Sequence, residues 1–158
     1  MGAGKTTIGR HLARALEREF VDSDKEIEAR TGVSVSLIFE IEGEAGFRSR
    51  EAQMIDELTR RSGIVLATGG GAVLRADNRA HLGDRGFVVY LRAPLDLLVE
   101  RTSRDRNRPL LANTDPRTRL AALLAEREPL YCGVADLIID SGPRTVRQVI
   151  KSIRDQLQ

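Results

Sequence analysis

The sequence predicts an α/β fold in which helices cover both faces of a parallel sheet. Four short apolar segments have the composition of strands, and longer segments with helical character separate them. These strands are apolar throughout rather than alternating, which is typical of parallel strands that are buried on both faces. No internal repeat, low-complexity tract or domain linker interrupts the 158 residues. We therefore expect one domain over 1–158.

Seven segments have the periodicity or the boundary residues of helices. The first is the clearest, because Ile8 and Leu12 fall on one face and charged side chains on the other. At the second, Ser23 and Glu26 have the spacing of a capping box, and Gly32 closes the helix. In chain order, the helices are expected over about 6–18, 23–31, 36–61 with an interruption at 42–46, 75–82, 94–102, 116–127 and 146–157.

The four strands are expected at 20–21, 63–68, 87–91 and 136–139. Between the third and fourth strands, the segment 103–115 is polar, rich in arginine and contains Pro109. This composition predicts a mobile loop.

The stretch Met1–Thr7 contains the second half of a phosphate-binding P-loop. In such a loop glycines let backbone N–H groups surround phosphate oxygens, the lysine (here Lys5) reaches the β- and γ-phosphates, and the next hydroxyl (Thr6) ligates Mg²⁺. The helix that begins here adds its positive N-terminal end. The alternative is a flexible, glycine-rich terminus with an accidental lysine. The chain has three Lys against 22 Arg, which argues against the accident.

The full pattern G-x-x-x-x-G-K-[ST] places its first glycine five residues before Gly4, which is ahead of Met1. A P-loop also follows a strand. We therefore expect Met1 to be an internal residue of the loop, with a fifth strand ahead of it.

Asp22 and Asp24 lie at the carboxyl end of the first expected strand, where open α/β sheets place their ligands. Two carboxylates at this spacing can divide the work, because one can approach Mg²⁺ through water while the other accepts the proton of a substrate hydroxyl. The alternative is a helix N-cap followed by a first-turn acid. The residues alone leave both interpretations open.

Arg48 and Glu51 are three residues apart on an expected helix, close enough to pair. A surface ion pair is the simpler interpretation. The other is an arginine held rigid by glutamate so that its planar fork grips a carboxylate. Gly69–Gly71 directly follow a strand and allow a ligand to approach the backbone closely, although a plain flexible loop would have the same composition.

Arginines also cluster around the polar segment 103–115. Arg108 could swing over a nucleotide and neutralise the transferring phosphate, and Arg101 could stack on adenine. A solvated basic loop is the alternative. Arg127 is expected to end a helix, where it would complement the helix dipole.

Together these segments resemble the shikimate kinase family in their order and spacing. The matching motifs span essentially the whole chain: MGAGKTT (1–7), FVDSD (20–24), GFRSRE (46–51), ATGGGAV (67–73), RNRPLL (106–111) and REPLY (127–131). The resemblance implies a P-loop NTPase-type, three-layer fold whose parallel sheet has five strands, of which four are visible here. It also implies a lid at about 103–115 and a substrate-binding helical region at about 24–61. The reaction implied is transfer of the γ-phosphoryl group of ATP to the 3-hydroxyl of shikimate, with Mg²⁺ present, in the pathway to chorismate.

The same resemblance implies a nucleotide side and a substrate side of one site. The residues implied to hold the phosphates are Gly2, Ala3, Gly4, Lys5, Thr6 and Thr7, with Mg²⁺ at Thr6 and Asp22. The adenosine end would meet Arg101 and Arg144, and Arg108 in the lid would reach the phosphates. On the substrate side, Asp24 would bind the ring hydroxyls and orient or deprotonate the attacking one. The substrate carboxylate would lie between Arg48 and Arg127, in a pocket lined by Gly69, Gly70 and Gly71. Lys5, Asp24 and Arg108 are the implied catalytic residues.

Composition argues against other classes of protein. No apolar run reaches the ~20 residues of a membrane span. A net charge of +2 and an aromatic content of 4% argue against nucleic-acid binding. No secretory signal is visible, and the single cysteine, Cys132, cannot form an internal disulfide, so we expect a cytoplasmic protein. The resemblance suggests a monomer.

Two competing functions remain. One is another small-molecule P-loop kinase, such as a gluconate or nucleoside monophosphate kinase. The paired aspartates, the glycine triplet and the Arg48–Arg127 pair argue against it. The other is a non-catalytic remnant that binds a nucleotide or a partner.

Overall fold

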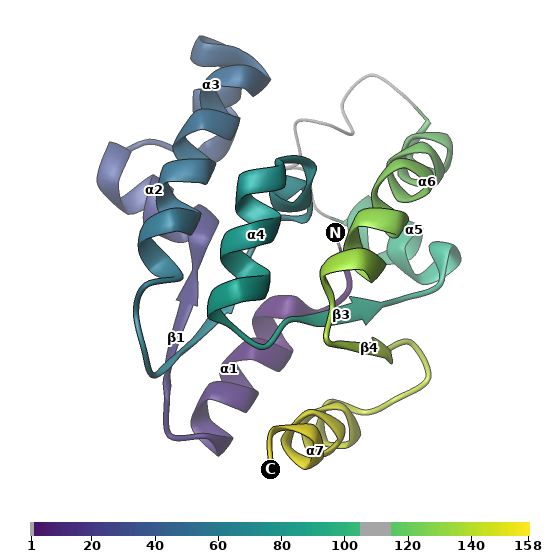
Figure 1. Ribbon diagram of the computed structural model, residues 1–158. Coiled ribbons are helices and arrows are strands. Elements are labelled where there is room, and N and C mark those ends of the chain that lie inside the picture. The colour runs from purple at the N-terminus through teal and green to yellow at the C-terminus, as the bar shows by residue number, and fades with distance from the viewer. Residues whose placement is uncertain (1, 105–114) are drawn as a thin grey trace.

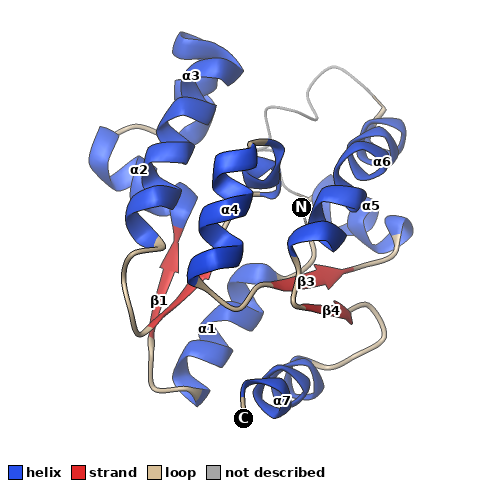
Figure 2. Ribbon diagram, in the orientation of Figure 1, coloured by secondary structure: helices blue, strands red, loops and turns tan. Residues whose placement is uncertain are grey.

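The computed structural model describes residues 2–104 and 115–158, in which helices and short strands alternate along the chain (Figures 1 and 2). In order, the elements are α1 (Lys5–Ala15), β1 (Glu19–Asp22), α2 (Ser23–Thr31), α3 (Val35–Leu58), β2 (Ile64–Ala67), the 3-10 helix η1 (Gly70–Leu74), α4 (Ala76–Arg85), β3 (Val89–Arg92), α5 (Leu95–Ser103), α6 (Pro116–Val134), β4 (Leu137–Asp140) and α7 (Val146–Leu157).

All four expected strands are present, and their pairing is parallel. β1 pairs with β2, where Asp22 lies opposite Ala67, and β3 pairs with β4, where Arg92 lies opposite Asp140. At the second of these positions, Arg92 Nε also donates to Asp140 Oδ1 at 2.7 Å. The expected α/β architecture with parallel strands is confirmed.

The strands lie between two layers of helices, so the fold has three layers. On one face, α1 and α7 pack together over β2, β3 and β4, with Leu12, Ile139 and Ile153 among the buried contacts. On the other face, α2 and α3 cover β1 and β2, and α5 and α6 pack beside β3. In β2, Ile64 and Leu66 face α3 while Val65 faces α1. The continuous apolar character of the strand follows from this burial on both faces.

Between the two strand pairs lies an apolar cavity of about 570 Å³. It is bordered by Ile64–Ala67 of β2, by Val89–Leu91 of β3, and by Ile8 and Leu12 of α1. Over the described residues, β1–β2 and β3–β4 form two separate two-stranded sheets, and the cavity lies between them.

The expected capping box at Ser23 is wrong. Asp22 is the N-cap of α2, and its Oδ1 accepts from the backbone N–H groups of Asp24 at 2.9 Å and Lys25 at 3.2 Å. A carboxylate is the stronger acceptor at the positive end of a helix. Ser23 is instead fully buried in the first turn.

The expectation that Arg127 ends its helix is also wrong, because α6 continues to Val134 and includes Pro129. A proline inside a helix costs about 3 kcal/mol or more. Contacts beyond the proline act against this cost, and among them the ring of Tyr131 packs against Tyr90 with 4.8 Å between ring centroids. The interruption expected at 42–46 is confirmed by Gly43, whose φ of 72° breaks the helical run of α3.

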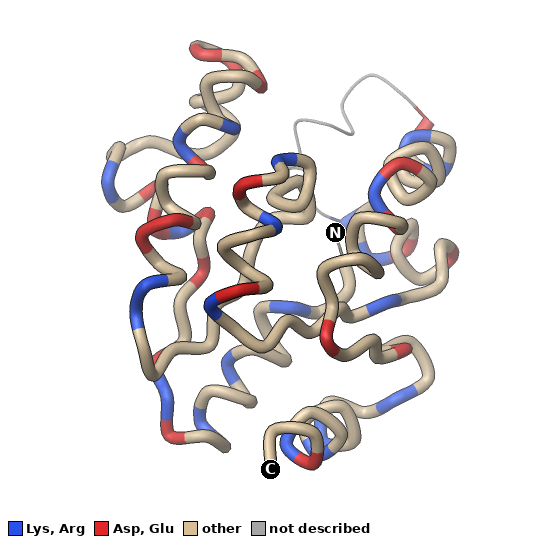
Figure 3. Tube along the Cα trace, in the orientation of Figure 1, with Lys and Arg blue, Asp and Glu red and all other residues tan. Residues whose placement is uncertain are grey.

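Basic and acidic positions are interspersed along α2, α3 and α4 (Figure 3). Many of them form exposed ion pairs, such as Arg30 with Glu57 at 2.6 Å and Arg50 with Glu42 at 2.7 Å. Pairs of this kind stabilise a fold by only about 0–1 kcal/mol each. Over the described ranges, no helix combines the length and apolar character needed to cross a membrane.

Candidate active site

A second cavity, of about 930 Å³, lies at the carboxyl ends of the strands. Asp22 at the end of β1, Ala67 at the end of β2 and Ser141 just after β4 all line it. Every site residue expected from the sequence lines this cavity, apart from Arg108: Gly2, Ala3, Gly4, Lys5, Thr6, Thr7, Asp22, Asp24, Arg48, Gly69, Gly70, Gly71, Arg101, Arg127 and Arg144. Arg108 and most of the expected lid lie outside the described residues.

The N-terminus of α1 has the features of an anion site. Gly4 is the N-cap with a φ of 87°, no side chain caps the helix, and no acidic residue lies in its first turn. Gly2 also has a positive φ, of 69°, and its carbonyl accepts from Arg101 Nη1 at 2.9 Å. Backbone N–H groups at such a terminus bind phosphate, and the helix dipole favours the negative charge.

Asp24 is placed to act as a base in the same cavity. One of its carboxylate oxygens, Oδ1, is buried and has no hydrogen-bond partner among the described residues. Burial and the neighbouring charge of Asp22 raise the pKa of Asp24, and the charges of Lys5 and Arg48 partly oppose this shift. A buried carboxylate without a partner is a ready acceptor for a ligand hydroxyl.

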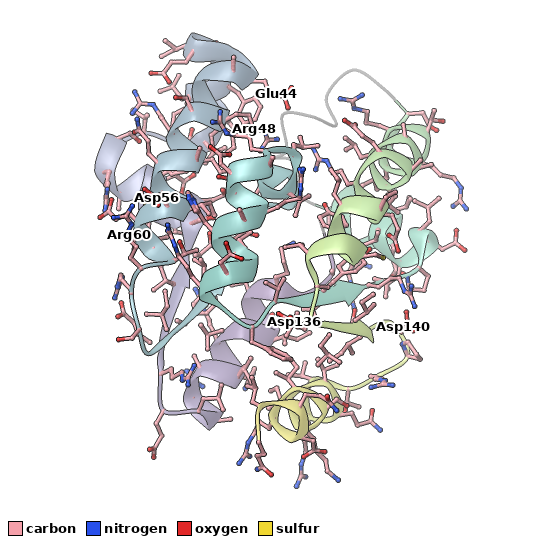
Figure 4. The ribbon with its side chains drawn as sticks, viewed as in Figure 1. Glu44, Arg48, Asp56, Arg60, Asp136 and Asp140 are labelled. Carbon is pink, nitrogen blue, oxygen red and sulfur yellow. The ribbon has the colours of Figure 1, made fainter. Side chains whose placement is uncertain are left out.

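Arg48 and Glu51 form the pair that their spacing predicts, but the pair is not on the surface. Arg48 Nη1 lies 2.8 Å from Glu51 Oε1, and the Glu51 side chain is 0% exposed. Burial raises the pKa of Glu51, and the charge of Arg48 opposes the rise. Figure 4 shows Arg48 on α3 beside Glu44, whose carboxylate is a second partner, at 3.4 Å. The arginine is thus held from two sides.

Arg127 lines the cavity from α6. It is buried, and its Nε has no hydrogen-bond partner in the described part of the chain. Two guanidinium groups, those of Arg48 and Arg127, therefore line one cavity. This arrangement suits a carboxylate ligand, because each fork can donate two parallel hydrogen bonds.

The glycine loop fits tightly between these side chains. A Cβ on Gly71 would overlap the Arg48 guanidinium, and one on Gly69 would lie 3.3 Å from carboxylate oxygens of both Asp24 and Glu51. A side chain at Gly69 or Gly71 would therefore displace the charged groups that line the cavity, and Gly70 and Gly71 belong to the 3-10 helix η1.

Three residues that support this loop were not expected from the sequence. Tyr131 donates its hydroxyl to Gly70 O at 2.7 Å, Asn78 Nδ2 donates to Ala72 O at 2.9 Å, and Arg79 Nη1 donates to Val73 O at 2.7 Å. Tyr131 lies in the REPLY motif, so a signal was present. Its contact with a residue 61 positions away could not be read from the chain.

Comparisons with known proteins agree with this site. The family model described as shikimate kinase matches residues 1–158. The shikimate kinase of Bordetella pertussis is 63% identical over 158 residues, which cover 100% of this chain and 75% of that protein. Neither gluconate kinase nor nucleoside monophosphate kinase is favoured.

Two solved structures extend the comparison. A shikimate kinase from Acinetobacter baumannii, solved in complex with shikimate, has a TM-score of 0.96 and 52% identity, covering 99% of this chain and 88% of that one. The enzyme from Bacteroides thetaiotaomicron has a TM-score of 0.90 and 32% identity, covering 99% and 93%. On the sequence match, the fold and the cavity together, the chain belongs to the shikimate kinase family.

Proposed function

We propose that this chain transfers the γ-phosphoryl group of ATP to the 3-hydroxyl of shikimate, giving shikimate 3-phosphate and ADP. The observation that carries the proposal is the convergence of three groups on one cavity: the uncapped start of α1, the buried carboxylate of Asp24, and the guanidinium groups of Arg48 and Arg127. The Acinetobacter relative, at 52% identity, was solved with shikimate bound, which supports the same substrate here.

On the nucleotide side, the backbone of Gly2–Thr7 and the Lys5 side chain would hold the phosphates. Arg101 and Arg144 line the same cavity and would meet the adenosine end. Phosphoryl transfer needs positioning and charge neutralisation more than covalent chemistry, and these cations supply both. A role for Arg108 in reaching the phosphates remains a prediction.

Mg²⁺ fits the donor set around the start of α1. Thr6 in the first turn and Asp22 at the end of β1 both line the cavity, and they would hold the ion through a hydroxyl and through water. The ion would neutralise charge on the phosphates. In the described chain no group of three or more His, Cys, Asp or Glu residues could hold a metal. An ion at this place would take its remaining ligands from water and from phosphate oxygens.

On the substrate side, Arg48 and Arg127 would grip the carboxylate of shikimate, and Gly69–Gly71 would line its pocket. Asp24 would accept hydrogen bonds from the ring hydroxyls and take the proton of the 3-hydroxyl as it attacks. The helical region 24–61 would thus supply Asp24 and Arg48 to the substrate. We further propose that the chain acts as a single-domain monomer in the cytoplasm, which light scattering after size-exclusion chromatography tests for the oligomeric state.

The experiment is ADP release from Mg-ATP with and without shikimate, followed by a panel of gluconate and nucleoside monophosphates. We expect ADP release that depends on shikimate, together with a product that carries one added phosphate by mass. The proposal would be contradicted if the rate of ADP release were the same with and without shikimate, or if another acceptor raised that rate more than shikimate does. A Lys5→Ala variant controls for a contaminating kinase, since its activity should fall sharply.

A further inference from the structure

The glycine loop at 69–71 has to be held in one conformation by other parts of the molecule. Gly71 must lack a side chain because the Arg48 guanidinium occupies the space. Gly70 and Gly71 open the short 3-10 helix η1, and such a turn is weak when it begins with glycines, because neither residue has a Cβ that restricts φ and ψ. A side-chain hydrogen bond to the Gly70 carbonyl therefore adds a constraint to those of the turn and of packing.

Side chains bonded to the loop carbonyls supply this constraint. Asn78 and Arg79 bond the carbonyls of Ala72 and Val73, but both donors belong to α4, which follows η1 directly. Tyr131 is the donor that reaches the glycine triplet itself, at Gly70 O, and it comes from α6.

Tyr131 is itself well anchored. Its ring packs on Tyr90 with 4.8 Å between centroids and a 31° angle between ring planes. Burial raises the pKa of its hydroxyl, so the group stays protonated and remains a donor through the physiological range. It also lies four residues after Arg127, which places the two side chains on the same face of α6.

These contacts form a continuous link between the two arginines of the site. Arg48 packs on Gly71, the adjoining Gly70 is bonded to Tyr131, and Tyr131 shares a helix face with Arg127. A carboxylate held by two guanidinium groups from different helices requires those helices to keep a fixed separation, because small displacements lose both bonds.

We propose that Tyr131 is a positioning residue for the carboxylate-binding part of the substrate site: its hydroxyl fixes the Gly70–Gly71 peptide against α6 and so sets the distance between Arg48 and Arg127. This inference rests on the proposed function, because it assumes that the two arginines bind the carboxylate of shikimate. Among the described residues, Tyr131 bonds Gly70 O and interacts with Arg127, both on the substrate side of the cavity, so its effect should be confined to shikimate.

The test compares Tyr131→Phe with Tyr90→Phe. Each variant loses one tyrosine hydroxyl and keeps the stacked ring, but Tyr90 donates to Glu128 at 2.6 Å and not to the glycine loop. We expect Tyr131→Phe to raise the KM and the Kd for shikimate by about three- to tenfold, the usual range for a lost buried hydrogen bond. The KM for ATP should stay within about twofold of the wild-type value. In Tyr90→Phe, the KM and Kd for shikimate and the KM for ATP should all stay within the same range.

Amide hydrogen exchange over 69–74, measured without substrates, provides a second and independent readout. Exchange there should be faster in Tyr131→Phe than in the wild type or Tyr90→Phe, whether or not the wild type turns over shikimate. Wild-type turnover thus reports on the proposed function, and the exchange comparison reports on Tyr131. Three results would each overturn the inference. The first is an exchange rate over 69–74 that Tyr131→Phe leaves unchanged, and the second is an equal rise in the KM values for shikimate and ATP in that variant. The third is a rise in the KM for shikimate in Tyr90→Phe as large as in Tyr131→Phe.

Discussion

The guanidinium of Arg48 and the carboxylate of Glu51 lie 2.8 Å apart across one turn of α3, with Glu51 completely buried and Arg48 13% exposed. The negative charge is thus removed from solvent while its arginine partner faces the 930 Å³ cavity. Burying a carboxylate is costly unless a cation accompanies it. The pair therefore fixes the arginine in place, and the remaining donors of that arginine are oriented for a ligand.

Replacing Glu51 by Gln should weaken shikimate binding roughly tenfold or more, since a charge-assisted hydrogen bond to Arg48 is lost. ATP binding should stay within about twofold of the wild-type value. Glu44→Gln is the matched control, because Glu44 also contacts Arg48 but its side chain is 51% exposed. Calorimetric titration with each ligand measures both effects. Equal losses in the two variants would show that the buried pair has no special role.

Asp24→Asn should lower kcat by about 10²- to 10⁴-fold, because an amide cannot accept the proton of the attacking hydroxyl. The dissociation constant of ATP should change little, since Asp24 is assigned to the substrate hydroxyls. Steady-state kinetics with both substrates varied, together with ATP titration, separate these effects. Comparable losses in turnover and in ATP affinity would contradict the role of Asp24 as a base.

The pH dependence of the reaction should report the raised pKa of Asp24. Only the deprotonated carboxylate accepts a proton, so kcat/KM for shikimate should fall as the pH drops through this pKa, at a pH above the ordinary value of 3.8. Asp22→Asn removes a neighbouring charge that raises the pKa, and should move the acid limb of the normalised profile to lower pH. Glu26→Gln is the control and should leave the limb in place. If Asp22→Asn left the acid limb at the same pH, the group that titrates in this limb would not be Asp24.

Asn78 should contribute to stability through its bond to the glycine-loop segment. It is 1% exposed and donates to Ala72 O, so Asn78→Ala should cost about 1–3 kcal/mol of unfolding free energy. Asn78→Asp should cost more, about 3–5 kcal/mol, because it buries a carboxylate against a carbonyl oxygen. Asp84→Asn, on the exposed face of α4, controls for the change of helix charge. Urea unfolding provides the free energies.

The two Asn78 variants should also differ in pH dependence. Burial raises the folded-state pKa of an aspartate at position 78 above its unfolded value near 3.9. The stability that the neutral acid provides is present below the unfolded pKa and is lost as the pH rises through the folded one. The difference in the free energy of unfolding between Asn78→Asp and Asn78→Ala should therefore increase from acid to neutral pH. A difference that is constant with pH would mean that the carboxylate reaches solvent.

The strand pattern was enough to predict strands covered by helices on both faces, and the local motifs indicated Lys5, Asp24 and Arg48. Arg144 and the ligand-binding role of Arg127 were predicted only through the resemblance to shikimate kinases. Continuous apolar runs follow from burial on both faces, as Ile64 and Val65 demonstrate by facing opposite helix layers. Parallel strands bring their carboxyl ends to one edge, which is why Asp22 and Gly69, far apart in sequence, meet in one cavity.

The errors came where contacts distant in sequence override local preference. The helix expected to end at Arg127 continues through Pro129 to Val134, and beyond the proline the ring of Tyr131 packs on Tyr90. The N-cap of α2 is a local case: the residues left open both a capping box at Ser23 and an N-cap at Asp22 followed by a first-turn acid, and the structure has the second. The hydrogen bond from Tyr131 to Gly70 depends on how α6 packs against η1, and no spacing of residues along the chain predicts that packing.

The apolar cavity between β2 and β3 leads to a last prediction, on stability. Residues of both strands border a space of about 570 Å³ between the two two-stranded sheets. A chain extended ahead of Met1 by a short apolar strand and the first P-loop glycine should fill this space, with each buried aliphatic side chain contributing about 1.5–3 kcal/mol before the cost of ordering. A Gly/Ser extension of equal length is the control, and urea unfolding measures the difference. The apolar extension should also lower the KM for ATP, because the completed loop adds backbone N–H donors for the phosphates. If both extensions left stability and the KM for ATP unchanged, the cavity would not accept a strand, and the half-loop at Gly2–Thr7 would be sufficient for the nucleotide.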